Sequence, residues 1–114
     1  MAEFSIIETY FNRQNKNAVD LGVGDDSAVL TPPHGQQLVI CADTSVAGRH
    51  FPMNTHPHSI GWKSVAVNLS DIAAMGAKPH SILLALSLPQ IDHAWLSNFS
   101  QGLYDCCDQF GVSL

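Results

Sequence analysis

Three parts of the chain place carboxylates within or next to apolar segments, where an unpaired charge is costly. Asp26 lies inside a segment with the apolar pattern of a strand, Asp43 directly follows an apolar run, and Asp71 lies within a helical pattern. Carboxylates are unfavourable in strands, and several that face one point repel each other unless a cation lies between them. Mg²⁺ binds a few carboxylates together with water and substrate phosphates. A cap, a turn or a surface charge would explain any one residue, whereas the three together predict a magnesium site.

Asp71 lies opposite the main apolar stripe of its predicted helix. At about 100° per residue, this stripe runs from Trp62 to Gly76, and the face around Asp71 is itself mostly apolar. We therefore expect the helix to be covered on both sides, with Asp71 among apolar neighbours. The predicted neighbours are Ile60, Ser64, Val67, Asn68 and Met75.

The common phosphate-binding and nucleophile motifs do not occur in the sequence. No GxxxxGK[ST] run is present, and Gly22-Val-Gly24 continues into two aspartates instead of completing GxGxxG. No cysteine or serine has the surroundings of an activated nucleophile. The remaining route to phosphoryl transfer is to position the reactants and to neutralise phosphate oxygens with Mg²⁺ ions.

The elements that would carry these residues follow the order α-β-β-α-β-α-(β), which predicts a mixed α/β (α+β) domain with a small sheet packed against helices. The first helix is expected over residues 5–12, with Ser5 and Glu8 as a capping box. Strands are expected over residues 21–30 and 38–46, joined by a turn with two prolines and a glycine.

A long loop over residues 47–58 follows the second strand. Loops of this length in a small domain are usually functional or mobile. After the loop, the pattern predicts a helix from Ser59 to about Ala74, a strand over residues 81–88, a helix capped by Asp92 and ended by Gly111, and the start of a strand over residues 112–114.

Composition excludes several classes of protein. The 114 residues are 46% hydrophobic and 13% charged, with a net charge of −5 and five scattered basic residues. This balance argues against binding to nucleic acid or to an anionic membrane surface, and no apolar run is long enough to span a bilayer. Cys41, Cys106 and Cys107 show neither CxxC spacing nor an even count, so we expect no disulfide or zinc site and a cytoplasmic location.

Several runs of the sequence resemble thiamine-monophosphate kinase. One matching stretch covers residues 66–77, and its specific part is Asn68–Gly76, whose looser form occurs in a superfamily that includes aminoimidazole ribonucleotide synthetase and selenophosphate synthetase. The Val46–Gly48 run followed by His50-Phe51 is similar to the kinase in particular. Shorter matches are Glu3–Ser5, Leu21–Asp26 and Asp43-Thr44.

This resemblance implies an activity and a set of site residues. Enzymes of the family transfer the γ-phosphoryl group of ATP to thiamine phosphate and form thiamine diphosphate, with Mg²⁺ as the cofactor. The attacking phosphate oxygen is already anionic, so no residue is expected as a catalytic base. The residues implied by the resemblance are metal ligands at Asp26, Asp43 and Asp71, further metal contacts at Cys41 and Ala42, and a substrate contact at His50.

Two of these residues depart from the family pattern, which often has hydroxyl side chains there. The thiol of Cys41 is a poor ligand for Mg²⁺, and Ala42 offers only its backbone carbonyl. Residues 1–114 are expected to form a single N-terminal domain for ATP and Mg²⁺ binding and for homodimerisation through its sheet. The resemblance further implies that a C-terminal domain is absent and that this fragment is inactive alone.

Two alternatives to this interpretation remain. The chain could be a metal-binding and dimerisation module without turnover of its own, or a related ATP-dependent enzyme with a different acceptor. A reactive cysteine and lysine in a glycine-rich N-terminal segment would favour selenophosphate synthetase, and neither occurs here.

Overall fold

A computed structural model of the chain describes residues 2–13, 19–24, 27–40, 42, 44–45 and 56–114. This part of the chain contains three helices and four short strands, which confirms the expected mixed α/β fold class. The elements are α1 (Ala2–Tyr10), β1 (Val19–Leu21), β2 (Val29–Leu30), β3 (Thr44–Ser45), α2 (Pro57–Ala74), β4 (Ala85–Leu86) and α3 (His93–Phe110).

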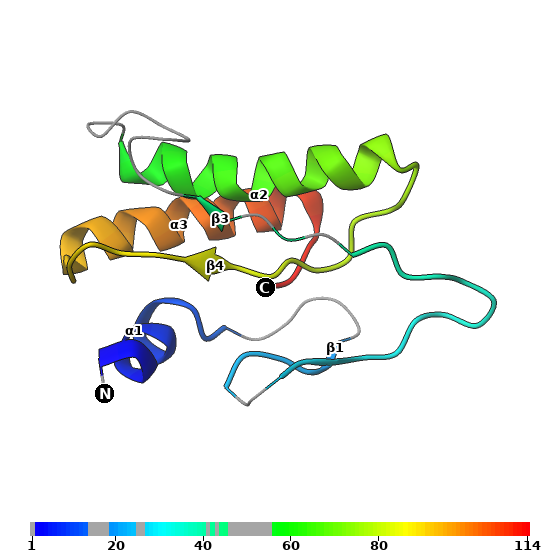
Figure 1. The fold of residues 1–114 in the computed structure, drawn as a ribbon, viewed down its shortest axis with the longest axis horizontal. Helices are drawn as coiled ribbons and strands as arrows, with labels where there is room; N and C mark the ends of the chain where they lie inside the picture. Colours follow the sequence, from blue (N-terminus) through cyan, green and yellow to red (C-terminus); the bar gives the residue numbers. More distant parts are fainter. Residues whose placement is uncertain (1, 14–18, 25–26, 41, 43, 46–55) are drawn as a thin grey trace.

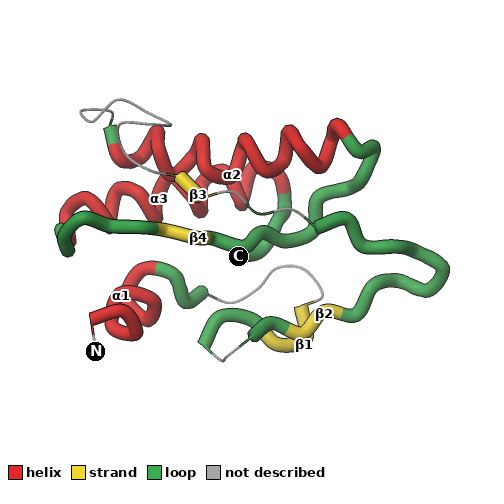
Figure 2. Tube along the Cα trace, viewed as in Figure 1, coloured by secondary structure: helices red, strands yellow, loops and turns green. Residues whose placement is uncertain are grey.

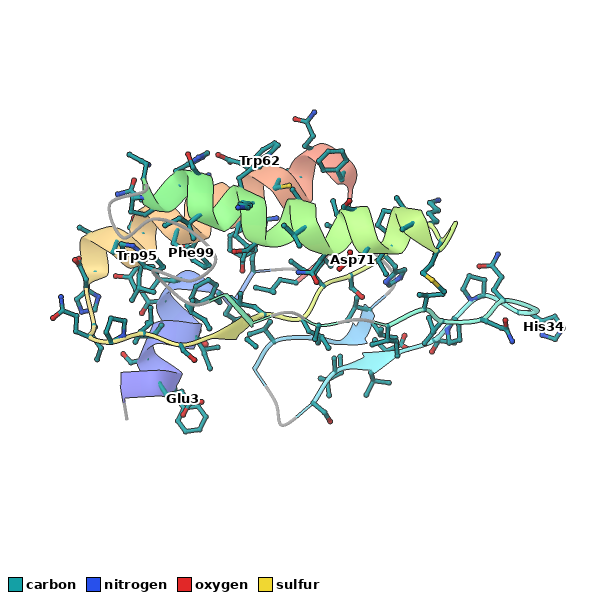
Figure 3. The ribbon with its side chains drawn as sticks, turned by 45° about the horizontal axis from the view of Figure 1, so that its top comes forward. Glu3, His34, Trp62, Asp71, Trp95 and Phe99 are labelled. Atoms are coloured by element: carbon teal, nitrogen blue, oxygen red, sulfur yellow. The ribbon has the colours of Figure 1, made fainter. Side chains whose placement is uncertain are left out.

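The two long helices form one layer, and the extended segment that contains β4 lies along it (Figure 1). Because the chain returns along β4 between them, α2 and α3 run in the same direction. The helix α1 and the hairpin of β1 and β2 lie below β4 in this view, on the opposite side from α2 and α3 (Figure 2). The segment between β2 and β3 extends away from the helices, with His34 at its tip (Figure 3).

The helices α2 and α3 approach until their backbones touch, and two glycines allow this. A Cβ atom added at Gly61 would lie 2.0 Å from the carbonyl oxygen of Phe99, and one added at Gly102 would lie 1.9 Å from that of His58. No real Cβ atom tolerates such distances from a backbone atom. Glycine is therefore required at both positions for this helix crossing.

The hydrophobic core lies around this crossing. Trp95 stacks on Phe99 with ring centroids 4.8 Å apart (Figure 3), and Phe11 packs edge-on against Phe99 at 6.2 Å. The chain segment after α1 is thereby tied to α3. The buried apolar residues are Phe11, Ile60, Val65, Leu96, Phe99, Leu103, Cys106, Cys107 and Val112.

Alternate residues along the β4 segment face the core. Ile82, Leu84, Leu86 and Leu88 pack against it, whereas Leu83 points outward and is 59% exposed. This period of two is the expected geometry of a strand with one covered face. The parallel partner of β4 is β3, with Thr44 opposite Ala85 and Ser45 opposite Leu86.

The chain after α3, where the start of a strand was predicted, forms an isolated parallel bridge beside the β4 segment. Ser113 forms a bridge with Ser81, in which the N–H of Ile82 donates to the carbonyl of Ser113 at 2.8 Å. Within the strand predicted over residues 81–88, the described pairings are at Ser81 and at Ala85–Leu86, so the strand is shorter than predicted.

Helix ends were predicted well where the capping signal is unambiguous. The carboxylate of Asp92 accepts a hydrogen bond from the N–H of Trp95 at 3.1 Å and caps α3. Gly76 and Gly111 follow α2 and α3 with φ of 68°, a left-handed conformation that glycine adopts without strain.

Two predicted helix starts were wrong. The helix α1 begins at Ala2, so Ser5 and Glu8 lie inside it and form no capping box. The N-cap of α2 is His56 and not Ser59, because the imidazole of His56 accepts a hydrogen bond from the N–H of His58. Pro57 occupies the first helical position, where the missing N–H costs nothing.

The two predicted N-terminal strands are also different in the structure. Residues 21–30 do not form one strand, because Gly24 adopts φ of 119° and the chain turns there between β1 and β2. Among the described residues of the predicted strand over residues 38–46, namely 38–40, 42 and 44–45, only Thr44–Ser45 is a strand. Ile40 is 74% exposed, since no described strand or helix covers the segment before it.

We predict that Gly61→Ala and Gly102→Ala each destabilise the chain. At an exposed helical position the same change would stabilise the helix by up to about 1 kcal/mol, but here the new methyl group meets backbone. Overpacking should cost about 1–3 kcal/mol and lower the melting temperature by about 5–15 °C. Thermal unfolding followed by circular dichroism measures this, with Ser97→Ala on the exposed side of α3 as the control. A Gly61→Ala variant as stable as the wild type would contradict the close crossing.

Candidate functional site

Four of the six predicted site residues lie outside the described residues, namely Asp26, Cys41, Asp43 and His50. The structure describes the other two, Ala42 and Asp71, and both are exposed. The surrounding elements show how each predicted segment joins the fold.

The segment that contains Asp26 links the strands of an antiparallel hairpin. Val19 lies opposite Leu30 in this hairpin, and the pairing shifts register by the next pair. The hydroxyl of Thr31 donates a hydrogen bond to the carboxylate of Asp20 across the two strands. These contacts hold the two ends of the Asp26 segment together.

The segment that contains Cys41, Ala42 and Asp43 leads directly into β3. Pairing of β3 with β4 fixes the end of this segment beside the core. The side chain of Ala42 cannot bind a metal, but its backbone carbonyl is an oxygen of the kind that Mg²⁺ accepts. A metal contact at this position would have to come from the main chain.

The environment of Asp71 differs from the prediction. Asn68 is only 8% exposed, but Val67 is 40% and Met75 69% exposed, and Asp71 is itself exposed. The expected second covered face is therefore incomplete: Ile60 and Asn68 are buried, but the face is exposed around Asp71 and Met75. In Figure 3, Asp71 lies along the lower edge of α2, on the side where the extended segments run. A carboxylate in this position is open to solvent and to a ligand.

Among the described residues, no group of three or more histidine, cysteine, aspartate or glutamate side chains is placed to hold a metal ion. The predicted ligands lie mostly in segments outside that part of the chain. The metal site therefore remains a prediction from the sequence.

A polar cluster at the start of α2 was not predicted. The Nε2 atom of His58 lies 2.8 Å from a carboxylate oxygen of Asp105, and the amide of Gln101 donates to the other oxygen at 2.7 Å. The hydrogen bond from His58, and then that from Gln101, lowers the pKa of Asp105. The contact between Gln101 and Asp105 could have been predicted, because residues four apart on a helix are neighbours. The contact of His58 with Asp105 could not, because the two residues lie on different helices.

Two further polar contacts join the α1 region to α3. The hydroxyl of Tyr10 lies 2.7 Å from Nδ1 of His93, and Arg13 forms an ion pair with Asp108 at 2.6 Å. The guanidinium of Arg13 also lies 4.0 Å above the ring of Tyr104. Burial raises the pKa of Tyr104 to about 12, although the Arg13 charge opposes this shift.

Among the helices that the structure describes, none combines the length and the apolar character needed to cross a membrane.

The family profile described as "AIR synthase related protein, N-terminal domain" matches residues 24–114. The chain is 47% identical to the thiamine-monophosphate kinase of Escherichia coli (strain K12), over 98% of this chain and 35% of the relative. It is 52% identical to the thiamine-monophosphate kinase of Synechococcus elongatus, over 80% of this chain and 28% of the relative. These similarities confirm the resemblance seen in the sequence runs.

A solved structure has the same fold. The crystal structure of thiamine-monophosphate kinase from Stenotrophomonas maltophilia K279a superposes with a TM-score of 0.76 at 44% sequence identity. The match covers 97% of this chain and 34% of that one. The chain thus spans about a third of the length of the relatives that it matches.

We predict that Asp105→Asn lowers stability in a pH-dependent way. Because the pKa of Asp105 is lower in the folded chain than in the unfolded chain, its ionised form stabilises the fold above the ordinary carboxyl pKa, and this stabilisation is lost as the pH falls through the lowered value. The His58 and Asp105 side chains are 40% and 41% exposed, so the effect should be about 1 kcal/mol or less. Urea unfolding at pH 6 and at pH values below about 3 measures it. A difference between the two proteins that is equal at both pH values would contradict the expectation.

Proposed function

The chain belongs to the family of AIR synthase related proteins, through their N-terminal domain, and we propose that it is the N-terminal domain of a thiamine-monophosphate kinase. The observation that carries this proposal is 47% identity to the Escherichia coli kinase over 98% of the chain. Similarity of this extent includes the Asn68–Gly76 run, which holds the predicted metal ligand Asp71.

The proposed reaction transfers the γ-phosphoryl group of ATP to the phosphate of thiamine phosphate. An oxygen of the acceptor phosphate attacks the γ-phosphorus, the bond from that phosphorus to the β,γ-bridging oxygen breaks, and ADP leaves. The attacking oxygen is already anionic, so the protein has no proton to remove. Its task is to align two polyanions that repel each other.

Carboxylates suit that task when Mg²⁺ is the cofactor. The donor set fits this ion, since it consists of oxygen ligands and the described member, Asp71, is exposed. We assign Asp26, Asp43 and Asp71 as ligands, with main-chain contacts at Cys41 and Ala42, and His50 as a contact to the substrate. Bound Mg²⁺ would neutralise phosphate oxygens and so lower the barrier.

The proposal includes a homodimer, a cytoplasmic location and a second domain. Exposed apolar side chains on the extended segments support an interface there, since Leu38, Ile40 and Leu83 are 50%, 74% and 59% exposed. The chain covers 35% of its Escherichia coli relative, so we propose that a C-terminal domain completes the nucleotide and substrate sites. By itself the chain should then show no kinase activity.

Two other functions are weaker alternatives. A dimerisation and metal-binding module would use the same sheet and carboxylates without turnover. A related enzyme with a different acceptor would keep the ATP site and change the substrate contacts. The relatives named above are thiamine-monophosphate kinases, which favours the kinase.

We predict that Asp71→Asn in the full-length kinase that contains this domain lowers kcat by about 100-fold or more, because metal-mediated charge neutralisation is lost. Since Asp71 is exposed, stability without metal should change by no more than about 0.5 kcal/mol. Steady-state kinetics and melting temperature without Mg²⁺ measure the two effects. The control is Glu8→Gln, an exposed carboxylate on α1. Unchanged turnover by the Asp71→Asn enzyme would refute the assigned role.

We predict that the chain self-associates and that Leu83→Lys weakens the association. The outward-facing Leu83 is 59% exposed, and an ammonium group there would have to be desolvated in an interface. Sedimentation velocity over a range of concentrations measures the dimer fraction. Gln109→Lys, at an exposed position of α3, adds the same charge elsewhere. A monomer at all concentrations would rule out this interface.

A further inference from the structure

Side chains at the end of α1 attach it to the first half of α3. The ring of Phe11 is 5% exposed and packs edge-on against Phe99, with ring centroids 6.2 Å apart. The hydroxyl of Tyr10 lies 2.7 Å from Nδ1 of His93 and 3.4 Å from the carbonyl oxygen of that residue. The end of α1 therefore contributes one buried ring and one polar contact.

Arg13 makes a second attachment further along α3. Its guanidinium donates to both carboxylate oxygens of Asp108, at 2.6 and 3.3 Å, and lies 4.0 Å from the centroid of the Tyr104 ring. Because Tyr104 and Asp108 are four residues apart, they are neighbours on one face of the helix. Residues 10–13 thus contact α3 both at its start and near its end, and we call them the α1 latch.

The α1 latch buries little apolar surface. Phe11 is the one fully buried residue among residues 3–13, and Phe4 at the other end of α1 is 63% exposed. The side chains of Arg13 and Asp108 are 36% and 39% exposed, so their ion pair contributes little to stability. Segments with few buried apolar contacts open locally at a lower free energy than the whole domain unfolds.

Tyr104 adds a cost to the closed latch. Its hydroxyl oxygen is buried and finds no hydrogen-bond partner among the described residues, which costs free energy that hydration would return. Burial raises the pKa of Tyr104 to about 12, although the charge of Arg13 opposes this shift. Because Arg13 lies over the Tyr104 ring, withdrawal of the latch would open this ring to water.

The buried thiol of Cys106 faces α2. It lies four residues from Gly102, whose backbone packs on α2. It also lies four residues from Phe110, whose ring packs edge-on against Trp62 of α2 with centroids 6.5 Å apart. Side chains four apart on a helix share a face, so a reagent reaches Cys106 only if the two helices separate.

The buried thiol of Cys107 lies toward the α1 latch instead. It follows Tyr104 by three residues, which makes the two side chains neighbours on α3. The thiol also raises the pKa of Tyr104, as the smallest of the three influences after burial and Arg13. Cys107 is therefore close to the ring that Arg13 covers.

We propose that the α1 latch opens as a unit and controls the access of solvent to Cys107, while α2 and α3 stay packed and keep Cys106 covered. The two adjacent thiols then differ in what must move before a reagent reaches them. This conformational device uses only contacts within the described chain and does not depend on the proposed function.

The test is the rate at which iodoacetamide alkylates each thiol of the folded 114-residue chain, divided by the rate in the urea-unfolded chain. Fragment ions in mass spectrometry distinguish the two adjacent cysteines at low extent of reaction. In the wild type, Cys107 should react at least about tenfold faster than Cys106, because local opening is more frequent than global unfolding. Arg13→Gln should raise the Cys107 rate about threefold to fivefold and leave the Cys106 rate within a factor of about two.

Asp105→Asn is the matched control, because it breaks an ion pair between α3 and α2 whose side chains are similarly exposed, at 40% and 41%. It should leave the Cys107 rate within a factor of about two. Phe11→Ala removes the buried ring of the latch and should raise the Cys107 rate about 100-fold or more. If Phe11→Ala does not fold, the exposed Arg13 still provides the test.

Several outcomes would overturn the proposal. Equal rates for the two thiols in the wild type would show that both are reached only by global unfolding. An unchanged Cys107 rate in Arg13→Gln would show that the latch does not cover this thiol. An equal rise at Cys106, or the same rise in Asp105→Asn, would show that the contacts of Arg13 only stabilise the fold.

Discussion

The contact between the backbones of α2 and α3 is the constraint on which the rest of the domain depends. Gly61 and Gly102 bring the helix axes close enough for Phe99 and Leu103 to pack against α2 without a side chain between them. The buried thiols Cys106 and Cys107 fill the remaining space one turn further along α3. Dense packing of this kind tolerates few changes in volume. The position of α2, and with it that of Asp71, therefore follows from a crossing that only glycine permits.

The same crossing explains why the end of α2 around Asp71 is exposed. A helix of 18 residues is about 27 Å long, and close contact at one point leaves its far end beyond the neighbouring helix. Asn68 is covered, whereas Met75 and Asp71 are not. An exposed carboxylate at the end of a firmly held helix is well suited to binding a ligand, because it costs no buried charge before the ligand arrives.

Local signals in the sequence predicted local structure correctly. Contacts between residues far apart in the chain could not be predicted from it. The cap at Asp92 and the end at Gly111 could be placed from a few adjacent residues, since their hydrogen bonds are made within one turn. In the strand expected over residues 38–46, the described residues 38–40 and 42 are not strand, because a strand exists only where a distant segment pairs with it. The exposure of Asp71 and the partner of His58 likewise depend on where α3 crosses α2. Periodicity within one helix carries no information on that point.

The path of the chain through β3, α2, β4, α3 and Ser113 has a thermodynamic consequence. Each strand in this path is parallel to the next, and parallel connections of one hand place their helices on one side of the sheet. Ile82, Leu84 and Leu86 are covered in this way, while Leu83 and Ala85 on the other side are left exposed. Any surface that covers those residues binds the folded chain and not the unfolded one. By mass action, the midpoint of unfolding should therefore rise with the concentration of any such binding surface.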